Sequence, residues 1–177
     1  MRRAKALLLA GLVLSFGARA TVQEGQAAPD VAGVDAHGDT VKLSALRGKV
    51  VVLSFWATWC GYCMKEMPTL ASMQTVADQK HLPLQVVLIN YMEDRDAFRG
   101  TSRLLRKEAP GVLATWDRYG AIGKQYGADQ GIPVMVMLRR DGTVAHLHVG
   151  YGEDMLNPLL AEINALLQEP AAAPGSH

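Results

Sequence analysis

The residues best suited to covalent chemistry in this 177-residue chain are its two cysteines, Cys60 and Cys63. An apolar run before them predicts a strand and the pattern after them predicts a helix, so both fall at a helix N-terminus. Unpaired N–H groups and the helix dipole favour a thiolate there. Their spacing puts the sulfurs one turn apart on one helix face, within reach of a disulfide. We expect Cys60, nearer the helix tip and solvent, to attack, and Cys63 to resolve the mixed disulfide.

Other uses of a cysteine pair have less support in the sequence. A purely structural disulfide would close only a tiny loop and add little stability. A zinc site needs more ligands, and the sequence has neither a second CxxC nor a His-x₃₋₅-His pattern. The alternative that stays open is a Cu(I)-binding metallochaperone that uses both thiolates, because soft ligands suit copper and Met64 and Met67 follow closely.

The elements that must position the cysteines follow from the hydrophobic pattern. Val50–Trp56 has the β-branched and aromatic content of a buried strand, and an apolar stripe carries the next helix to about Lys80. The other expected elements are a hairpin of 30–34 and 40–43 with Gly38 in its turn, a capped helical turn over 44–48, a strand over 84–89, a helix from 94 or 96 to 108, an irregular stretch around Trp116, a short helix near 119–126, a hairpin of 134–138 and 143–149, and a final helix over 154–167.

The N-terminal segment has the pattern of an export signal. Basic residues precede an apolar run that ends in small residues, which predicts a signal peptide over residues 1–20, cleaved after Ala20 rather than kept as a membrane anchor. The mature chain would carry 14 Lys and Arg against 17 Asp and Glu, a formal charge of −3. This charge indicates neither nucleic acid nor an anionic membrane surface as a partner.

The composition also predicts the domain organisation. Residues 21–29 are small and polar and form an expected flexible lead-in, while 30–168 have the size of one domain with a sizeable core. Residues 169–177 are rich in Pro and Ala and form an expected disordered tail.

The sequence around the cysteines resembles that of the exported TlpA-like (ResA/CcmG) thiol-disulfide oxidoreductases of the thioredoxin superfamily. The residues that carry the resemblance are Phe55-Trp56-Ala57-Thr58-Trp59-Cys60-x-x-Cys63-x-x-Glu66-x-Pro68-x-Leu70, together with the later Ile132-Pro133 that opens a hairpin. The similarity covers roughly residues 30–167. It implies an α/β thioredoxin fold, with a central mixed β-sheet flanked by helices, an N-terminal β-hairpin and an extra helix.

The resemblance also implies roles for individual residues. Cys60 and Cys63 form the redox-active disulfide, and Pro133 is a cis-proline beside it that holds the substrate backbone through Ile132. Independently of the resemblance, we expect Trp59 to cover the sulfurs and to form part of a flat apolar docking surface; the alternative is a tryptophan that is only packed in the fold. Glu66 stands one turn beyond Cys63, so we expect its carboxylate to exchange protons with the thiols.

Three residues depart from the family pattern. Tyr62 stands between the cysteines where the family most often has proline, and this dipeptide tunes the redox potential. Ser54 replaces a buried aspartate or asparagine, so Glu66 would act without a second proton acceptor. Val134 replaces the threonine that usually follows the cis-proline.

Together these features predict a periplasmic thiol-disulfide oxidoreductase that needs no cofactor and no metal. We expect it to reduce disulfides of exported protein clients, with apocytochrome c or a copper-site protein as candidates, and to be recharged by a membrane thiol electron donor. We also expect a monomer that binds no nucleic acid. The predicted direction is reducing because the negative charge of Glu66 raises thiol pKa values and lowers the potential.

Overall fold

The computed structural model describes residues 22–150, 152 and 155–170. The predicted signal peptide, its cleavage site and most of the predicted tail lie outside these residues. The elements are β1 (Val31–Val34), β2 (Thr40–Lys42), η1 (Leu43–Leu46), β3 (Val50–Trp56), α1 (Gly61–Gln79), β4 (Leu84–Tyr91), α2 (Arg95–Glu108), β5 (Leu113–Asp117), η2 (Gly123–Tyr126), η3 (Ala128–Gln130), β6 (Val134–Leu138), β7 (Val144–Val149) and α3 (Leu156–Gln168), where η marks a 3-10 helix.

The strands form one mixed sheet in the order β2-β1-β5-β4-β3-β6-β7. The three central strands β5, β4 and β3 run parallel, while β6, β7, β1 and β2 pair antiparallel with their neighbours. Parallel strands end at the same edge of a sheet. The segments that follow β3, β4 and β5 therefore meet at one edge, and the cysteines follow β3.

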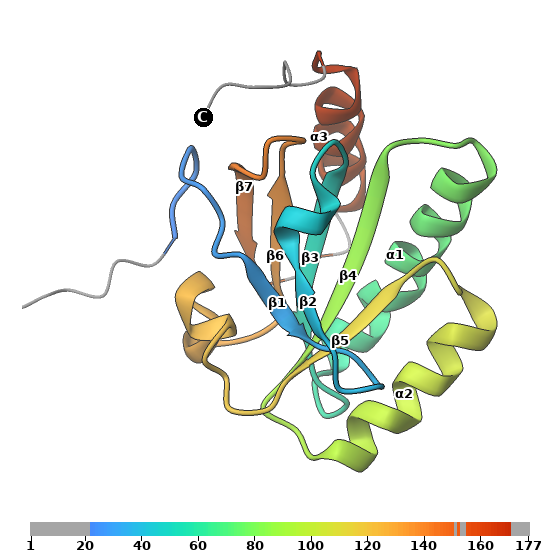
Figure 1. Cartoon of the computed structure of the whole chain (residues 1–177), viewed down its shortest axis with the longest axis vertical. Coiled ribbons are helices and arrows are strands. Elements are labelled where there is room, and N and C mark those ends of the chain that lie inside the picture. Colours follow the sequence, from blue (N-terminus) through green and yellow to red (C-terminus); the bar gives the residue numbers. More distant parts are fainter. Residues whose placement is uncertain (1–21, 151, 153–154, 171–177) are drawn as a thin grey trace, which may run out of the picture.

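The two faces of the sheet are covered differently (Figure 1). Successive strand residues point to opposite faces. Val50 and Val52 face a core cluster that contains residues of α1, α2 and α3. Val51, Leu53 and Phe55 face a second cluster, which contains residues of the η1, η2 and η3 segments. Three α-helices thus cover one face, and short 3-10 segments cover the other. The predicted thioredoxin fold is confirmed.

Several predicted elements need correction. The stretch around Trp116 is the regular strand β5, whose five residues are too few to show a clear period in the sequence. Parallel pairing with β4 stabilises it. The short helix expected near 119–126 is the 3-10 helix η2, followed by η3. The turn before β3 has no side-chain cap, and the N–H of Ser44 instead donates to Asp30 Oδ1 at 2.7 Å.

The segment expected to be a flexible lead-in is bound to the sheet. The backbone N–H of Gly25 donates to the carbonyl of Val144, and the N–H of Val144 donates to the carbonyl of Gln26, both at 2.8 Å. Val22 donates to the carbonyl of Gln125 at 2.8 Å. Small polar residues carry no strand pattern, so only the pairing with β7 reveals this extended segment.

Candidate functional site

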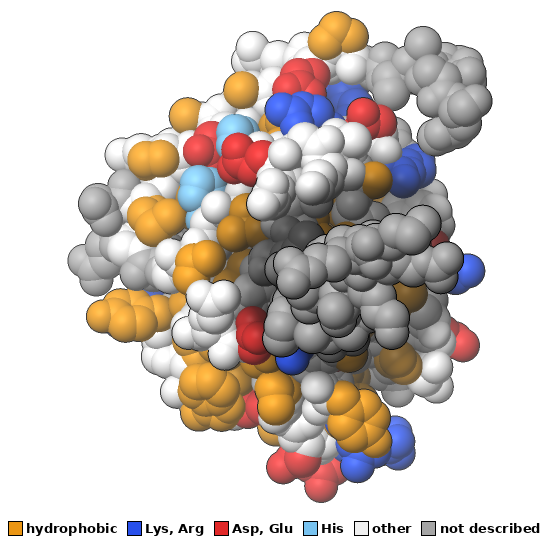
Figure 2. Space-filling view, turned by 90° about the vertical axis from the view of Figure 1, so that its left-hand side faces the viewer, with side chains coloured by type: hydrophobic (Ala, Val, Ile, Leu, Met, Phe, Trp, Pro, Cys, Tyr) orange, Lys and Arg blue, Asp and Glu red, His pale blue; other side chains and the backbone are white. Residues whose placement is uncertain are grey.

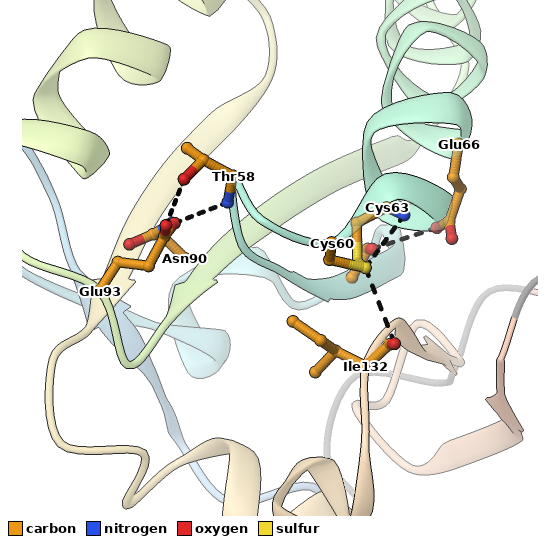
Figure 3. Close-up of a disulfide and its surroundings, with 8 residues drawn as sticks. Thr58, Cys60, Cys63, Glu66, Asn90, Glu93 and Ile132 are labelled. Atoms are coloured by element: carbon orange, nitrogen blue, oxygen red, sulfur yellow. Dashed lines mark hydrogen bonds between the residues drawn. A yellow bond between two sulfur atoms is a disulfide. The ribbon is translucent and has the colours of Figure 1, made fainter.

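The two cysteines lie where β3 turns into α1 and form a disulfide (Figure 3). Cys60 is the N-cap residue of α1, and its Sγ accepts a hydrogen bond from the backbone N–H of Cys63 at 3.2 Å. Their Cα atoms are 5.3 Å apart. The predicted placement at a helix N-terminus is confirmed. A sulfur that accepts an N–H bond at this end of a helix is in the surroundings that stabilise a thiolate after reduction.

Exposed aromatic side chains flank a disulfide that is itself buried. In this oxidised form Cys60 is 6% exposed and Cys63 is 2% exposed. Trp59 and Tyr62 are 70% and 60% exposed. The aromatic rings therefore lie on the surface that a protein substrate must approach, and Cys60 is the slightly more accessible of the two sulfurs.

The segment Ile132-Pro133 lies beside the disulfide, as the sequence predicted. The peptide bond between these residues is cis. Cys60 Sγ lies 3.7 Å from the carbonyl oxygen of Ile132. Pro133 directly precedes β6, which pairs antiparallel with β3 and so fixes this loop next to the start of α1. A backbone carbonyl is thereby presented next to the sulfur that we expect to react.

Glu66 is buried under the active-site helix rather than solvated. Its side chain is 3% exposed, and its Oε1 accepts a hydrogen bond from the Ser54 hydroxyl at 3.1 Å. Burial disfavours the charged form and raises the pKa of Glu66 from 4.5 to about 7, although the Ser54 bond acts in the opposite direction. Ser54 therefore acts as a donor to Glu66, which sequence reasoning did not anticipate. A carboxyl group with this pKa can take up or release a proton near neutral pH.

Glu93 is a site residue that the sequence analysis missed. Its carboxylate accepts hydrogen bonds from the backbone N–H of Thr58 at 2.8 Å, from the Thr58 hydroxyl, and from the side-chain amide of Asn90 at 2.5 Å. The indole N–H of Trp116 donates to its backbone carbonyl at 3.0 Å. Glu93 thus ties the loop before Cys60 to the ends of β4 and β5. The available signal was the acidic pair Glu93-Asp94, which begins two residues after the end of β4 at the sheet edge where the cysteines also lie.

The described residues outside the disulfide offer little that could complete a metal site. No group of three or more His, Cys, Asp or Glu residues in this part of the chain could hold a metal ion. Of the methionines considered as soft ligands, Met67 is buried in the core and Met64 is exposed.

The histidines of β7 take part in contacts at the sheet edge. The side chains of His148 and Glu162 lie 2.7 Å apart, which joins β7 to α3. His146 lies 3.9 Å from Glu24 of the N-terminal segment. Figure 2 shows histidine side chains beside carboxylates on this face of the molecule. These contacts join β7 to α3 and to the N-terminal segment.

Comparisons with known proteins agree with this arrangement. The model of the Redoxin family matches residues 23–163. The chain is 31% identical to the thioredoxin-like protein YneN of Bacillus subtilis over 135 residues, which cover 73% of each protein. It is 34% identical to the thiol-disulfide oxidoreductase ResA of the same organism over 103 residues, which cover 56% of this chain and 55% of ResA.

A solved structure extends the similarity over most of the chain. It belongs to a Chlorobium tepidum protein that carries the name thiol:disulfide interchange protein DsbE. The TM-score is 0.68 and the sequence identity 33%, and the match covers 82% of this chain and 99% of the other.

Proposed function

The chain belongs to the Redoxin family and is a thiol-disulfide oxidoreductase of the thioredoxin superfamily, and from this premise we propose that it reduces disulfides of exported proteins in the periplasm. The observation that carries the proposal is the Cys60–Cys63 disulfide at the N-terminus of α1, with the buried carboxyl group of Glu66 one turn further along the same helix. The export pattern of residues 1–20 supports the location. Within the described residues, no helix has the length and apolar character needed to span a membrane.

The reaction transfers two electrons to the client. The thiolate of reduced Cys60 attacks one sulfur of the client disulfide, and the other client sulfur leaves as a thiolate that takes up a proton. Cys63 then loses its proton and attacks Cys60 Sγ, which breaks the mixed disulfide and releases the second client thiol. The products are the Cys60–Cys63 disulfide and a reduced client, and a membrane thiol donor would restore the dithiol.

The surrounding residues have distinct roles in this scheme. The N-terminus of α1 stabilises the thiolate of Cys60. Glu66 accepts the proton of Cys63, for which a pKa of about 7 is well suited. The carbonyl of Ile132, next to Cys60 Sγ, and the exposed ring of Trp59 contact the client backbone near the mixed disulfide.

The reducing direction is tested by the redox potential. Oxidising members of this fold have potentials near ~−120 mV because their reduced form is strongly stabilised. The negative charge that Glu66 acquires on ionisation opposes a second negative charge on the sulfurs, so we expect a potential below about −200 mV. Equilibration with glutathione buffers measures it, and a value near ~−120 mV would identify an oxidase instead.

The clients are identified by trapping. Cys63→Ser leaves the attacking Cys60 but removes the resolving thiol, so mixed disulfides accumulate and mass spectrometry names the trapped proteins. Cys60→Ser is the matched control and should trap none. Equal capture by the two variants would contradict the assignment of Cys60 as the nucleophile. Apocytochrome c and copper-site proteins are the clients that we expect.

A further inference from the structure

A small pocket opens at the edge of the sheet where the disulfide lies. It is formed by the turn after β1, the first turns of α2 and the end of β5, and its volume is about 130 Å³. Pockets that enclose a whole small molecule usually measure ~300–1,000 Å³. The pocket therefore suits one side-chain-sized group of a larger ligand.

Two arginines give the pocket a positive lining. Arg95 and Arg99 are four residues apart on α2 and so share one helix face. The Arg95 guanidinium lies 5.8 Å from the ring centre of Trp116, which also lines the pocket. Among the described residues, Arg99 has neither a hydrogen bond nor an ion pair. Both guanidinium groups therefore have N–H donors available to a ligand.

The acidic residue in the lining is already engaged. Asp35 Oδ1 accepts hydrogen bonds from the backbone N–H groups of His37, Gly38 and Asp39 at 2.8–2.9 Å. Burial acts to raise the pKa of Asp35, but these backbone bonds outweigh it and hold the pKa below its usual value. Its charge stabilises the turn and offsets only one of the two arginines, so the pocket keeps a positive excess.

The pocket is connected to the redox site through hydrogen bonds. Trp116 donates its indole N–H to the carbonyl of Glu93, and the Glu93 carboxylate binds Thr58, two residues before Cys60. The three residues come from the ends of parallel strands that meet at one edge of the sheet. The pocket and Cys60 therefore lie at the same edge of the sheet.

We propose that the pocket of Arg95, Arg99 and Trp116 binds a carboxylate side chain of the client protein and so favours clients with an acidic residue near the reacting disulfide. The proposal rests on the proposed function. Guanidinium groups present paired N–H donors that match the two oxygens of a carboxylate, which makes them suited to this recognition.

Binding is tested without any redox step. The probe is a cysteine-free peptide with three successive glutamates, titrated into the oxidised protein while NMR follows the indole N–H signal of Trp116, assigned with Trp116→Phe. We expect the signal to shift, and the double variant Arg95→Gln/Arg99→Gln to abolish the shift. The control Arg103→Gln/Arg106→Gln removes the same charge from exposed positions of the same helix and should retain it. A shift with inorganic phosphate but none with the peptide would mean a site for free anions and would overturn the proposal.

The effect on turnover is tested with two disulfide peptides that differ only in three glutamates or three glutamines. We expect the reduced wild type to react about five-fold faster with the glutamate peptide at low salt, and the Arg95→Gln/Arg99→Gln variant to lose this preference. Equal rates in the wild type, or equal loss in the control variant, would overturn the proposal. Failure to reduce either peptide would contradict the proposed function, whereas the binding titration would still decide the role of the pocket.

Discussion

Two carboxylates lie on opposite sides of the disulfide, and their surroundings differ (Figure 3). Glu66 is buried and receives one hydrogen bond from the described residues, donated by Ser54, so burial raises its pKa to about 7. Glu93 is half-buried and receives three, two from Thr58 and one from Asn90. Several donors hold a carboxylate in place as an anchor, whereas burial with one donor suits proton exchange. Proximity to a redox site alone does not determine the role of a carboxylate.

The largest expected effect concerns stability. Because the folded-state pKa of Glu66 is raised from 4.5 to about 7, its contribution to stability is fully present below about pH 4.5 and is lost as the pH rises through about 7. The glutamine in the Glu66→Gln variant cannot ionise. The free energy of unfolding of this variant, relative to that of the wild type, should therefore rise by roughly 3 kcal/mol between pH 4.5 and pH 8. Urea unfolding of the oxidised proteins measures this difference. The exposed Glu108→Gln is the control, and an equal Glu66→Gln effect at both pH values would refute the assignment.

The next effect concerns thiol chemistry. If Glu66 accepts the proton of Cys63, Glu66→Gln should slow disulfide reduction at pH 7 by at least about ten-fold and remove the inflection near pH 7 from the rate profile. Stopped-flow kinetics with a model disulfide between pH 5 and pH 9 measures both. A pH profile identical to that of the wild type would leave Glu66 as a structural residue.

A smaller effect on stability, opposite in sign to that of Glu66→Gln, is expected when Glu93 is replaced. Glu93→Gln keeps the shape of the side chain but removes the charge that strengthens its bonds to Thr58 and Asn90. We expect it to lower the free energy of unfolding by about 1 kcal/mol at pH 8, where Glu66→Gln should raise it. The same urea experiment decides, and stabilisation by Glu93→Gln would remove the contrast between the two carboxylates.

The smallest effect should come from the donor to Glu66. Ser54→Ala removes the hydrogen bond that lowers the pKa of Glu66, so that pKa should rise by about half a unit. Carboxyl ¹³C NMR follows the titration, with Ser102→Ala as a buried serine control on α2. A fall in the pKa would mean that Ser54 does not stabilise the ionised form.

The parts of this site that the sequence predicted are those with a local pattern. Val50–Trp56 has a composition typical of buried strands, and the i, i+3 spacing already placed Glu66 on the same helix face as Cys63. This spacing predicts which face of the helix a side chain shares, but it does not predict how deeply that side chain is buried. The depth of Glu66 and its contact with Ser54 therefore became evident only when α1 was packed on β3.

The parts that were missed depend on contacts between distant segments. Glu93 meets Thr58 across 35 residues, and a glutamate after a strand resembles any solvated residue. β5 has too few residues to show a clear hydrophobic period in the sequence, and its backbone hydrogen bonds form by pairing with β4. The N-terminal segment likewise becomes ordered by pairing with β7, which lies more than a hundred residues away in the chain.

That pairing also protects the molecule from aggregation. β7 is an edge strand, and an uncovered edge offers free N–H and C=O groups to other chains. Gly25 and Gln26 occupy such groups of Val144, and the Glu24 carboxylate accepts the N–H of Leu147 at 3.2 Å. Cleavage at the predicted site after Ala20 would leave this cover in place, whereas a cut only six residues later would remove Glu24, Gly25 and Gln26 from the strand. A chain that begins at residue 21 therefore keeps the outer edge of β7 covered, whereas a chain that begins at residue 27 would leave the N–H and C=O groups of Val144 and the N–H of Leu147 open to other chains.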